Sequence, residues 1–160
     1  MPLSPRLEAI AGLIPPGSRV ADVGTDHGHL AVFLIRQEIA PFVIATDVAA
    51  GPLEAARRSA ERAGITEELD FRLANGLDAV SPHEIDAVVI AGMGGETMAG
   101  ILHRAPWLKS EPYHLILQPQ SKVPELIDFL SEEGYCILEQ HTVEDSGRDY
   151  IIFEVTAWQV

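Results

Sequence analysis

The chain has 160 residues, 47% of them apolar, and a formal charge of −13 from 11 Lys plus Arg against 24 Asp plus Glu. This length suits one domain with a packed core, and the apolar share excludes a disordered chain. Cys136 is the only cysteine, so no internal disulfide forms. Together with the lack of a signal-peptide pattern, this predicts a cytoplasmic protein. No apolar run could cross a bilayer, and the acid surplus counts against tight, unaided nucleic-acid binding.

Apolar strands and amphipathic helices follow one another along the whole chain. Ser4 and Pro5 begin a helix that stops at the turn "PPG". We expect strands at 19–23, 42–48, 69–74, 85–92, 113–118, 135–143 and 150–158, and further helices at 29–39, 51–64, 96–105 and 121–134. This order predicts one α/β domain over 1–160, with a Rossmann-like, seven-stranded, mostly parallel sheet, an antiparallel last strand and helices on both faces. Ligands of such sheets bind beyond the carboxyl ends of the strands.

The stretch "VADVGTDHGHL" (20–30) ends the first strand and opens a helix. Gly24 and Gly28 permit close approach to a ligand, and a helix start offers free amides to an anion. A dinucleotide fingerprint requires glycines where Asp26 and His29 stand, and a carboxylate facing a pyrophosphate is repulsive. The loop therefore favours a zwitterion, such as the amino-acid end of S-adenosylmethionine. Asp22 supplies the acidic residue that begins methyltransferase loops.

Polar residues also follow the second and third expected strands. Asp47 ends the second strand, where an acid in nucleotide-binding sheets accepts hydrogen bonds from both ribose hydroxyls. The alternative is a helix N-cap, because "DVAAGP" precedes a helix. Asn75 and Gly76 follow the third strand, where the Asn amide can donate to and accept from an adenine edge. A plain turn at "NGL" is the alternative there.

A second glycine cluster, "IAGMGGETM" (90–98), follows the fourth expected strand. One glycine satisfies an ordinary tight turn. The three glycines around Met93, which are Gly92, Gly94 and Gly95, therefore predict that a ligand or another backbone comes close.

The fifth strand ends in "LQPQ", where Gln118 and Gln120 flank Pro119 and either amide can bind a base edge. The D/N-P-P-Y/F motif of methyltransferases that act on exocyclic amines does not occur in the sequence. A ring nitrogen is the favoured acceptor, since its lone pair needs placing in line with a methyl group more than it needs deprotonation.

Two of the six histidines, His27 and His29, lie in the first loop. A His-x-His pair can bind metal, but no Cys or carboxylate at ligand spacing supports it. We therefore expect no metal site and expect His27 to contact the cofactor or substrate.

Several stretches together resemble a known family: "LSPRLEAIAGLI", "VADVGTDHGHL", "GPLEAA", "NGLDAV", "IAGMGGETM", "LILQPQ" and "GRDYIIFEV". In this order, and over almost the whole chain, they are similar to the TrmK-type bacterial tRNA (adenine-N1) methyltransferases. The resemblance implies a class I methyltransferase domain that uses S-adenosylmethionine and methylates N1 of adenine in the D-arm region of tRNA.

The resemblance also implies roles for particular residues. The residues expected at the cofactor are Asp22, Gly24, Asp26, His27, Gly28, Asp47, Val48, Asn75, Gly76, Ala91 and Gly92. The residues expected at the target base and the transferred methyl are Asp26, Met93, Gly94, Gln118 and Pro119. We expect Asp26 to stabilise the cation formed on the base without acting as a base itself.

The sequence departs from the family in two respects. Family members carry a further helical, coiled-coil-like domain after the last strand, whereas this sequence ends at Val160. We therefore expect a chain without that arm, which binds tRNA weakly. Gln120 stands where members often have Asn. Two alternatives remain open, a methyltransferase for another substrate and a non-catalytic S-adenosylmethionine-binding relic; basic residues clustered on one face would favour tRNA.

Overall fold

Seven strands form one sheet in the order β3-β2-β1-β4-β5-β7-β6 in the computed structural model, which describes residues 3–157. Strands β1 to β5 are parallel, and β7 runs antiparallel to both of its neighbours. The strands are β1 (Val20–Val23), β2 (Val43–Asp47), β3 (Leu69–Leu73), β4 (Ala87–Gly94), β5 (His114–Ser121), β6 (Cys136–Asp145) and β7 (Arg148–Thr156). The predicted fold class is confirmed.

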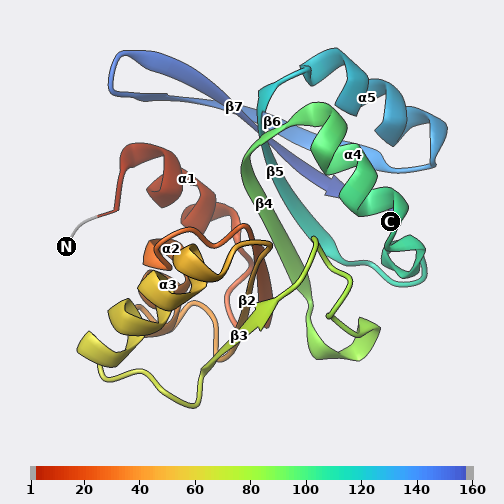
Figure 1. Cartoon of the computed structure of the whole chain (residues 1–160). Helices are drawn as coiled ribbons and strands as arrows, with labels where there is room; N and C mark the ends of the chain where they lie inside the picture. Colours follow the sequence, from red (N-terminus) through yellow and green to blue (C-terminus); the bar gives the residue numbers. More distant parts are fainter. Residues whose placement is uncertain (1–2, 158–160) are drawn as a thin grey trace.

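Helices cover both faces of the sheet (Figure 1). On one face, α1 (Pro5–Leu13), α2 (His29–Arg36) and α3 (Ala50–Arg62) bury apolar residues such as Ile10, Leu34 and Ala60 against the strands. On the other face, α4 (Gly95–His103) and α5 (Val123–Glu132) do the same with Met98 and Leu126. None of the helices among residues 3–157 is long and apolar enough to cross a membrane.

The local signals in the sequence account for several helix ends. The Ser4 hydroxyl accepts a hydrogen bond from the Leu7 amide at 3.3 Å, and Pro5 occupies the first turn, as predicted. Gly64 and Gly134 follow α3 and α5 with φ of +74° and +82°, a backbone conformation that glycine adopts without strain. These capping residues explain why the helices begin and end close to their expected positions.

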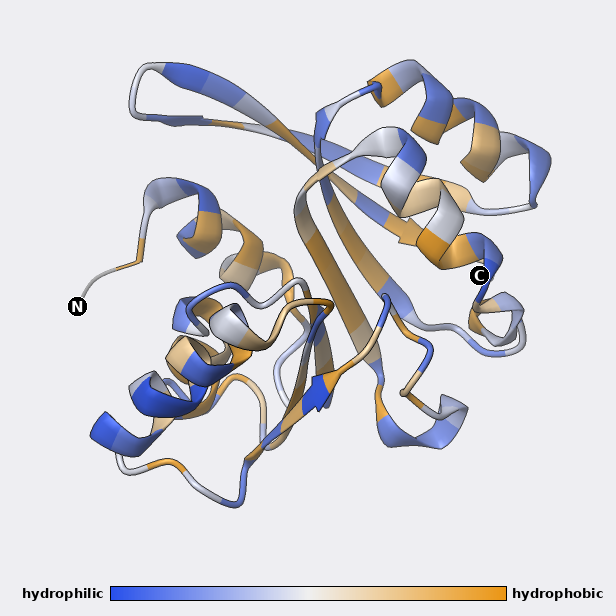
Figure 2. Cartoon of the chain, viewed as in Figure 1, coloured by the Kyte–Doolittle hydropathy of each residue, from blue (hydrophilic) through white to orange (hydrophobic). Residues whose placement is uncertain are grey.

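The central strands are apolar because both of their faces are covered. Every residue of β1 is buried, as are the first four residues of β2 and β4. Figure 2 shows the hydrophobic colour along β4 and β5, whereas the outer turns of α3 are hydrophilic. This pattern is typical of a parallel sheet between two helical layers.

The fourth and fifth strands extend further than the sequence predicted. Strand β4 continues through the second glycine cluster, where Met93 pairs with Pro119 and Gly94 with Ser121 across two register shifts. The expected boundary was wrong because bulges let glycines remain in a strand. Two 3-10 turns, at Pro82–Glu84 and Pro106–Lys109, were not expected. Residue 158 of the expected last strand lies outside the described residues.

Gly95 is required for the packing of α4 against the start of α5. A Cβ atom built on Gly95 would lie 2.1 Å from the carbonyl oxygen of Lys122 and 3.2 Å from Cβ of Leu126. A backbone oxygen cannot move aside as a flexible side chain can. One of the three clustered glycines therefore serves the approach of another backbone, which is one of the two reasons that the cluster suggested.

Gly95→Ala is expected to lower the free energy of unfolding by about 2 kcal/mol, because the added methyl overpacks a backbone contact. Urea denaturation measures the change. Gly94→Ala is the matched control: Gly94 has φ −68°, and the atoms nearest to a Cβ there belong to the side chains of Glu96 and Ser121. We expect it to cost less than about 1 kcal/mol. Equal losses in both variants would contradict this account of Gly95.

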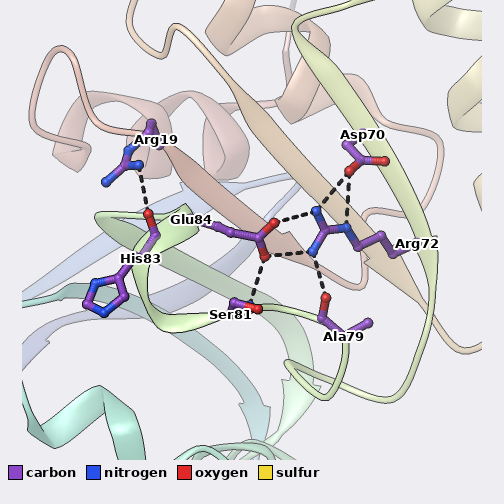
Figure 3. Close-up of polar contacts among 7 residues, drawn as sticks. All are labelled: Arg19, Asp70, Arg72, Ala79, Ser81, His83 and Glu84. Atoms are coloured by element: carbon purple, nitrogen blue, oxygen red, sulfur yellow. Dashed lines mark hydrogen bonds and ion pairs between the residues drawn. The ribbon is translucent and has the colours of Figure 1, made fainter.

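Arg72 ties the edge strand β3 to the segment that leads into β4 (Figure 3). Its guanidinium bonds both oxygens of Glu84 at 2.8 Å and also bonds Asp70 and the Ala79 carbonyl. The Glu84 carboxylate in turn accepts the Ser81 amide at 2.8 Å. The connection from β3 to β4 carries only a 3-10 turn, and this network holds it in place.

The Arg72–Glu84 pair should make stability depend on pH. The hydrogen bonds from Arg72 lower the pKa of Glu84 from 4.5 to about 2. Its contribution is therefore complete above pH 4.5 and is lost as the pH falls toward 2. Because about a third of the Glu84 side chain is exposed, we discount the shift to about 1–2 kcal/mol. Glu84→Gln should lose this much at pH 7 and only about a quarter as much at pH 2.5 in urea denaturation.

Candidate functional site

A cleft of about 360 Å³ opens at the carboxyl ends of β1, β2 and β4, where the strand order reverses. Helix α1 and the start of α2 form its other walls. The residues that line it are Arg6, Leu7, Asp22, Gly24, Thr25, Asp26, His27, His29, Leu30, Asp47, Ala91, Gly92, Met93 and Gln120. This volume is within the range of small-molecule sites.

The structure brings eight of the predicted site residues into this cleft: Asp22, Gly24, Asp26, His27, Asp47, Ala91, Gly92 and Met93. Other predicted residues lie around it without lining it, namely Gly28, Val48, Asn75, Gly76, Gly94, Gln118 and Pro119. A Cβ on Gly28 would meet Cβ and Cα of Ala56 at 2.8 and 3.0 Å, so this glycine permits α2 to pack on α3. Val48 and Asn75 are exposed, and Gly76 is buried.

Three carboxylates give the cleft a negative potential. Asp22 is buried, and its Oδ2 accepts a hydrogen bond from the Thr25 hydroxyl at 3.0 Å. Burial raises the pKa of Asp22 to about 6, the Thr25 bond opposes this, and the nearby charges of Asp47 and Asp26 add to the rise. A cation bound beside Asp22 would stabilise its ionised form and so offset both the cost of burial and the repulsion from Asp47 and Asp26.

The first loop is held by the end of strand β2. The amides of Gly24 and Thr25 donate to the carbonyl oxygen of Thr46 at 2.8 and 3.0 Å, so these two groups are already occupied. The anion-binding amides that the sequence suggested are therefore those in the first turn of α2, from His29 onward. Asp26 adopts a left-handed backbone conformation with φ +55°, which is a sparsely populated state for a residue other than glycine.

Asp47 is placed for both of the roles that the sequence left open. Its Oδ1 accepts a hydrogen bond from the Ala49 amide at 3.0 Å, just before α3 begins. The carboxylate also lines the cleft and is only partly buried. One oxygen therefore fixes the turn into α3, and the other is available to a ligand hydroxyl.

Gln118 connects three elements beneath the cleft. Its Oε1 accepts hydrogen bonds from Arg6 Nη1 at 2.8 Å and from the Gly92 amide at 3.1 Å, and its Nε2 donates to the Pro119 carbonyl at 3.1 Å. The residue is fully buried. Gln118 thus positions the glycine cluster and Arg6, while Gln120, two residues on, lines the cleft itself.

Arg6 lines the cleft, a position that the sequence analysis did not assign to this basic residue. It comes from α1, far in sequence from the strands that carry the motifs, and its guanidinium lies 5.7 Å from the centre of the Tyr150 ring. Arg148 lies over the same ring at 5.7 Å. A signal was present, because "LSPRLEAIAGLI" is one of the stretches that resemble the family, but no local pattern assigns the arginine a role.

The basic side chains differ in whether an acidic side chain of the protein pairs with them. Six of the 11 form ion pairs with acids of the chain: Arg19, Arg57, Arg58, Arg72, Arg104 and Lys109. The remaining five form none with residues 3–157, and these are Arg6, Arg36, Arg62, Lys122 and Arg148. Arg36 and Arg62 line a hollow of about 750 Å³ between α1, α2 and α3, which shares Leu7 and His29 with the cleft. Lys122 and Arg148 lie beside the carboxyl end of β5, and Arg6 lines the cleft, whereas Arg36 and Arg62 stand in the last turns of α2 and α3, away from the carboxyl ends of the strands.

The strand order and the acidic cleft at the carboxyl ends of β1 and β2 define a class I methyltransferase domain. A family model described as a methyltransferase domain matches residues 3–153. The tRNA (adenine(22)-N(1))-methyltransferase of Bacillus subtilis (strain 168) is 32% identical over 97% of the chain, and the chain spans 65% of that relative's length.

Solved structures agree with this relationship. The B. subtilis m1A22 tRNA methyltransferase TrmK superposes with a TM-score of 0.91 at 32% identity, over 98% of this chain and 67% of that one. A Streptococcus pneumoniae protein in complex with S-adenosyl-L-methionine gives 0.93 at 34% identity, over 99% and 75%. The chain therefore belongs to the TrmK-type branch of the methyltransferase domain family, which confirms the resemblance seen in the sequence.

Proposed function

We propose that the chain is a methyltransferase domain that transfers the methyl group of S-adenosylmethionine to N1 of an adenine in tRNA. The acidic cleft is the observation that carries this proposal. It holds Asp22, Asp26 and Asp47 around one ligand space, next to the glycine cluster of β4. Such a substrate would place the activity in the cytoplasm.

The residues of the cleft fit S-adenosylmethionine better than a dinucleotide. This cofactor carries an ammonium and a sulfonium, both of which are attracted by the carboxylates around Asp22. Asp47 can accept hydrogen bonds from the ribose hydroxyls, and the first turn of α2 can receive the cofactor carboxylate. A pyrophosphate would instead meet three like charges.

Bound S-adenosylmethionine would supply an electrophilic methyl group, whose carbon the adenine N1 lone pair would attack in line as the carbon–sulfur bond breaks and its electrons pass to sulfur. Positive charge moves from sulfur to the base, and no proton has to be removed. The chain's task is therefore to orient the base and to accommodate the cation. Gln120, Met93 and Asp26 line the cleft with Gly92, and in this proposal the Asp26 carboxylate stabilises the methylated ring.

The unpaired cations support RNA as the substrate. Arg6, Arg148 and Tyr150 form a cation–aromatic group beside the cleft, and such groups bind both phosphates and bases. Only five cations are free of ion pairs with residues 3–157, so few phosphates can be neutralised. We therefore expect weak tRNA binding with a shallow dependence on salt.

The test is transfer of a labelled methyl group from S-adenosylmethionine to unmodified tRNA, followed by nucleoside analysis. We expect the label in N1-methyladenosine. Gln120→Ala should lower kcat/KM for tRNA about tenfold, the effect of one lost hydrogen bond to the base, and leave S-adenosylmethionine binding unchanged in calorimetry. Gln140→Ala, an exposed glutamine of β6, is the matched control.

The outcomes separate the alternatives. Label found in another nucleoside or in a small molecule would show that the substrate assignment is wrong and that the cofactor assignment holds. Cofactor binding without transfer to any tRNA, at high enzyme concentration, would favour the non-catalytic relic. Binding of NAD with similar affinity would overturn the cofactor assignment itself.

A further inference from the structure

Four titratable side chains converge on one face of the terminal strands, at a distance from the cleft along β5 and β7. His141 Nε2 lies 2.7 Å from Glu154 Oε2 and 3.5 Å from Glu139 Oε2. One ligand atom from each of these three residues lies within 4.8 Å of the others. His114, at the start of β5, bonds the second Glu154 oxygen at 3.1 Å.

The strand register places two negative charges directly opposite each other in this cluster. Glu139 of β6 pairs with Glu154 of β7, beside a register shift between Ile137 and Glu139. Like charges in opposite positions of an antiparallel pair are destabilising. Because side chains two residues apart share a face, His141 is also directed to the same side as Glu139. The bulge thus gathers two carboxylates and an imidazole where a cation would remove the repulsion.

We propose that Glu139, His141 and Glu154 form a zinc-binding site that joins β6 to β7. One imidazole nitrogen and two carboxylate oxygens are common zinc ligands, with bonds of about 2.0–2.1 Å. Tetrahedral ligands at that distance are roughly 3.3 Å apart. The 2.7 and 3.5 Å separations from His141 are close to this value, and the carboxylates of Glu139 and Glu154, at most 4.8 Å apart, would reach it by side-chain rotation. Water completes the coordination.

His114 has a positioning role in this site. It holds Glu154 Oε1, so that Oε2 is directed toward His141. Hydrogen-bonded partners of this kind orient metal ligands, and their loss typically costs about 10–100-fold in metal affinity. The site is independent of the methyltransferase proposal, because none of its four residues lines the cleft.

The test is calorimetric titration of the whole chain with zinc chloride after chelator treatment. We expect one zinc ion per chain, abolished binding in His141→Ala, and about 10–100-fold weaker binding in His114→Ala. His103→Ala, which changes an exposed histidine of α4, should bind as the wild type does. Substitution with cobalt should give the visible absorption of a four-coordinate ion.

The thermal stability of Glu139→Gln distinguishes a zinc site from a simple His–Glu ion pair. With chelator present, this variant should unfold at the same temperature as the wild type or a higher one, because the repulsion from Glu154 is gone. With zinc, the wild type should gain thermal stability and Glu139→Gln should not. The proposal is overturned if the wild type binds no zinc, if these variants bind it unchanged, or if His27→Ala abolishes binding instead.

Discussion

S-Adenosylmethionine should bind about tenfold more weakly for each unit that the pH falls below 6. The cause is Asp22, whose pKa burial raises from 3.8 to about 6 in the ligand-free protein. A nearby ammonium or sulfonium favours the carboxylate and lowers its pKa in the complex. Below pH 6 the carboxyl must lose a proton before it can meet the ligand cation, and this cost reduces the affinity.

Calorimetry between pH 4.5 and 8 measures this dependence, with Asp22→Asn as the variant. The amide cannot titrate, so its affinity should be lower at pH 7.5 and nearly flat with pH. Asp22→Asn should raise the free energy of unfolding at pH 7.5, although it lowers the affinity for the cofactor there. A raised pKa contributes stability below pH 3.8 that is lost as the pH rises through 6, so Asp22→Asn should unfold at higher denaturant concentration than the wild type at pH 7.5. An unchanged pH profile in the variant would assign the titration to another group.

Asp47→Ala should weaken S-adenosylmethionine binding by about 1–3 kcal/mol, or roughly 5–150-fold, because charge-assisted hydrogen bonds to the ribose are lost. The variant also loses the acceptor for the Ala49 amide, which should cost about 1 kcal/mol of stability. Calorimetry and urea denaturation separate the two losses.

Two controls distinguish the ribose contact from the helix cap. Asp47→Asn keeps an oxygen for the Ala49 amide and removes the charge, so it should retain stability while binding S-adenosylmethionine more weakly. Asp78→Ala removes an exposed acid that pairs with Arg104, and should leave the affinity unchanged. If Asp47→Ala lowers stability but not affinity, the aspartate serves the turn into α3 alone.

The fold could be predicted from the sequence because its signals are local. Apolar runs bounded by glycine and proline identify the strands, and Ser4 with Pro5 identifies the first helix. The placement of Asp22 and Asp47 at the cleft was likewise predictable, since they stand at or next to the ends of buried strands whose carboxyl ends must meet at one edge. The structure reproduced the strands and helices that these local patterns predict to within a few residues, and the bulges at the ends of β4 and β5 extend these two strands.

Contacts between distant segments could not be predicted. Gly95 is a glycine because the Lys122 carbonyl lies against it, and Gly28 because Ala56 of α3 does. A glycine at either position could equally have allowed a ligand to come close, as we expected for Gly28. Arg6 reaches Gln118 across 112 positions of sequence, so no periodicity or spacing indicates that α1 contributes to the cleft.

The bond between Arg6 and Gln118 has an electrostatic consequence. A carboxylate at position 118 would hold the guanidinium equally well, but it would also cancel its charge. The carboxamide and the Tyr150 ring fix the guanidinium while leaving it a full unit of positive charge. In a chain with 13 excess negative charges, this neutral tether keeps one unneutralised positive charge beside the three carboxylates of the cleft. The RNA substrate proposed above would find there one of the few positive charges that no acid of residues 3–157 neutralises.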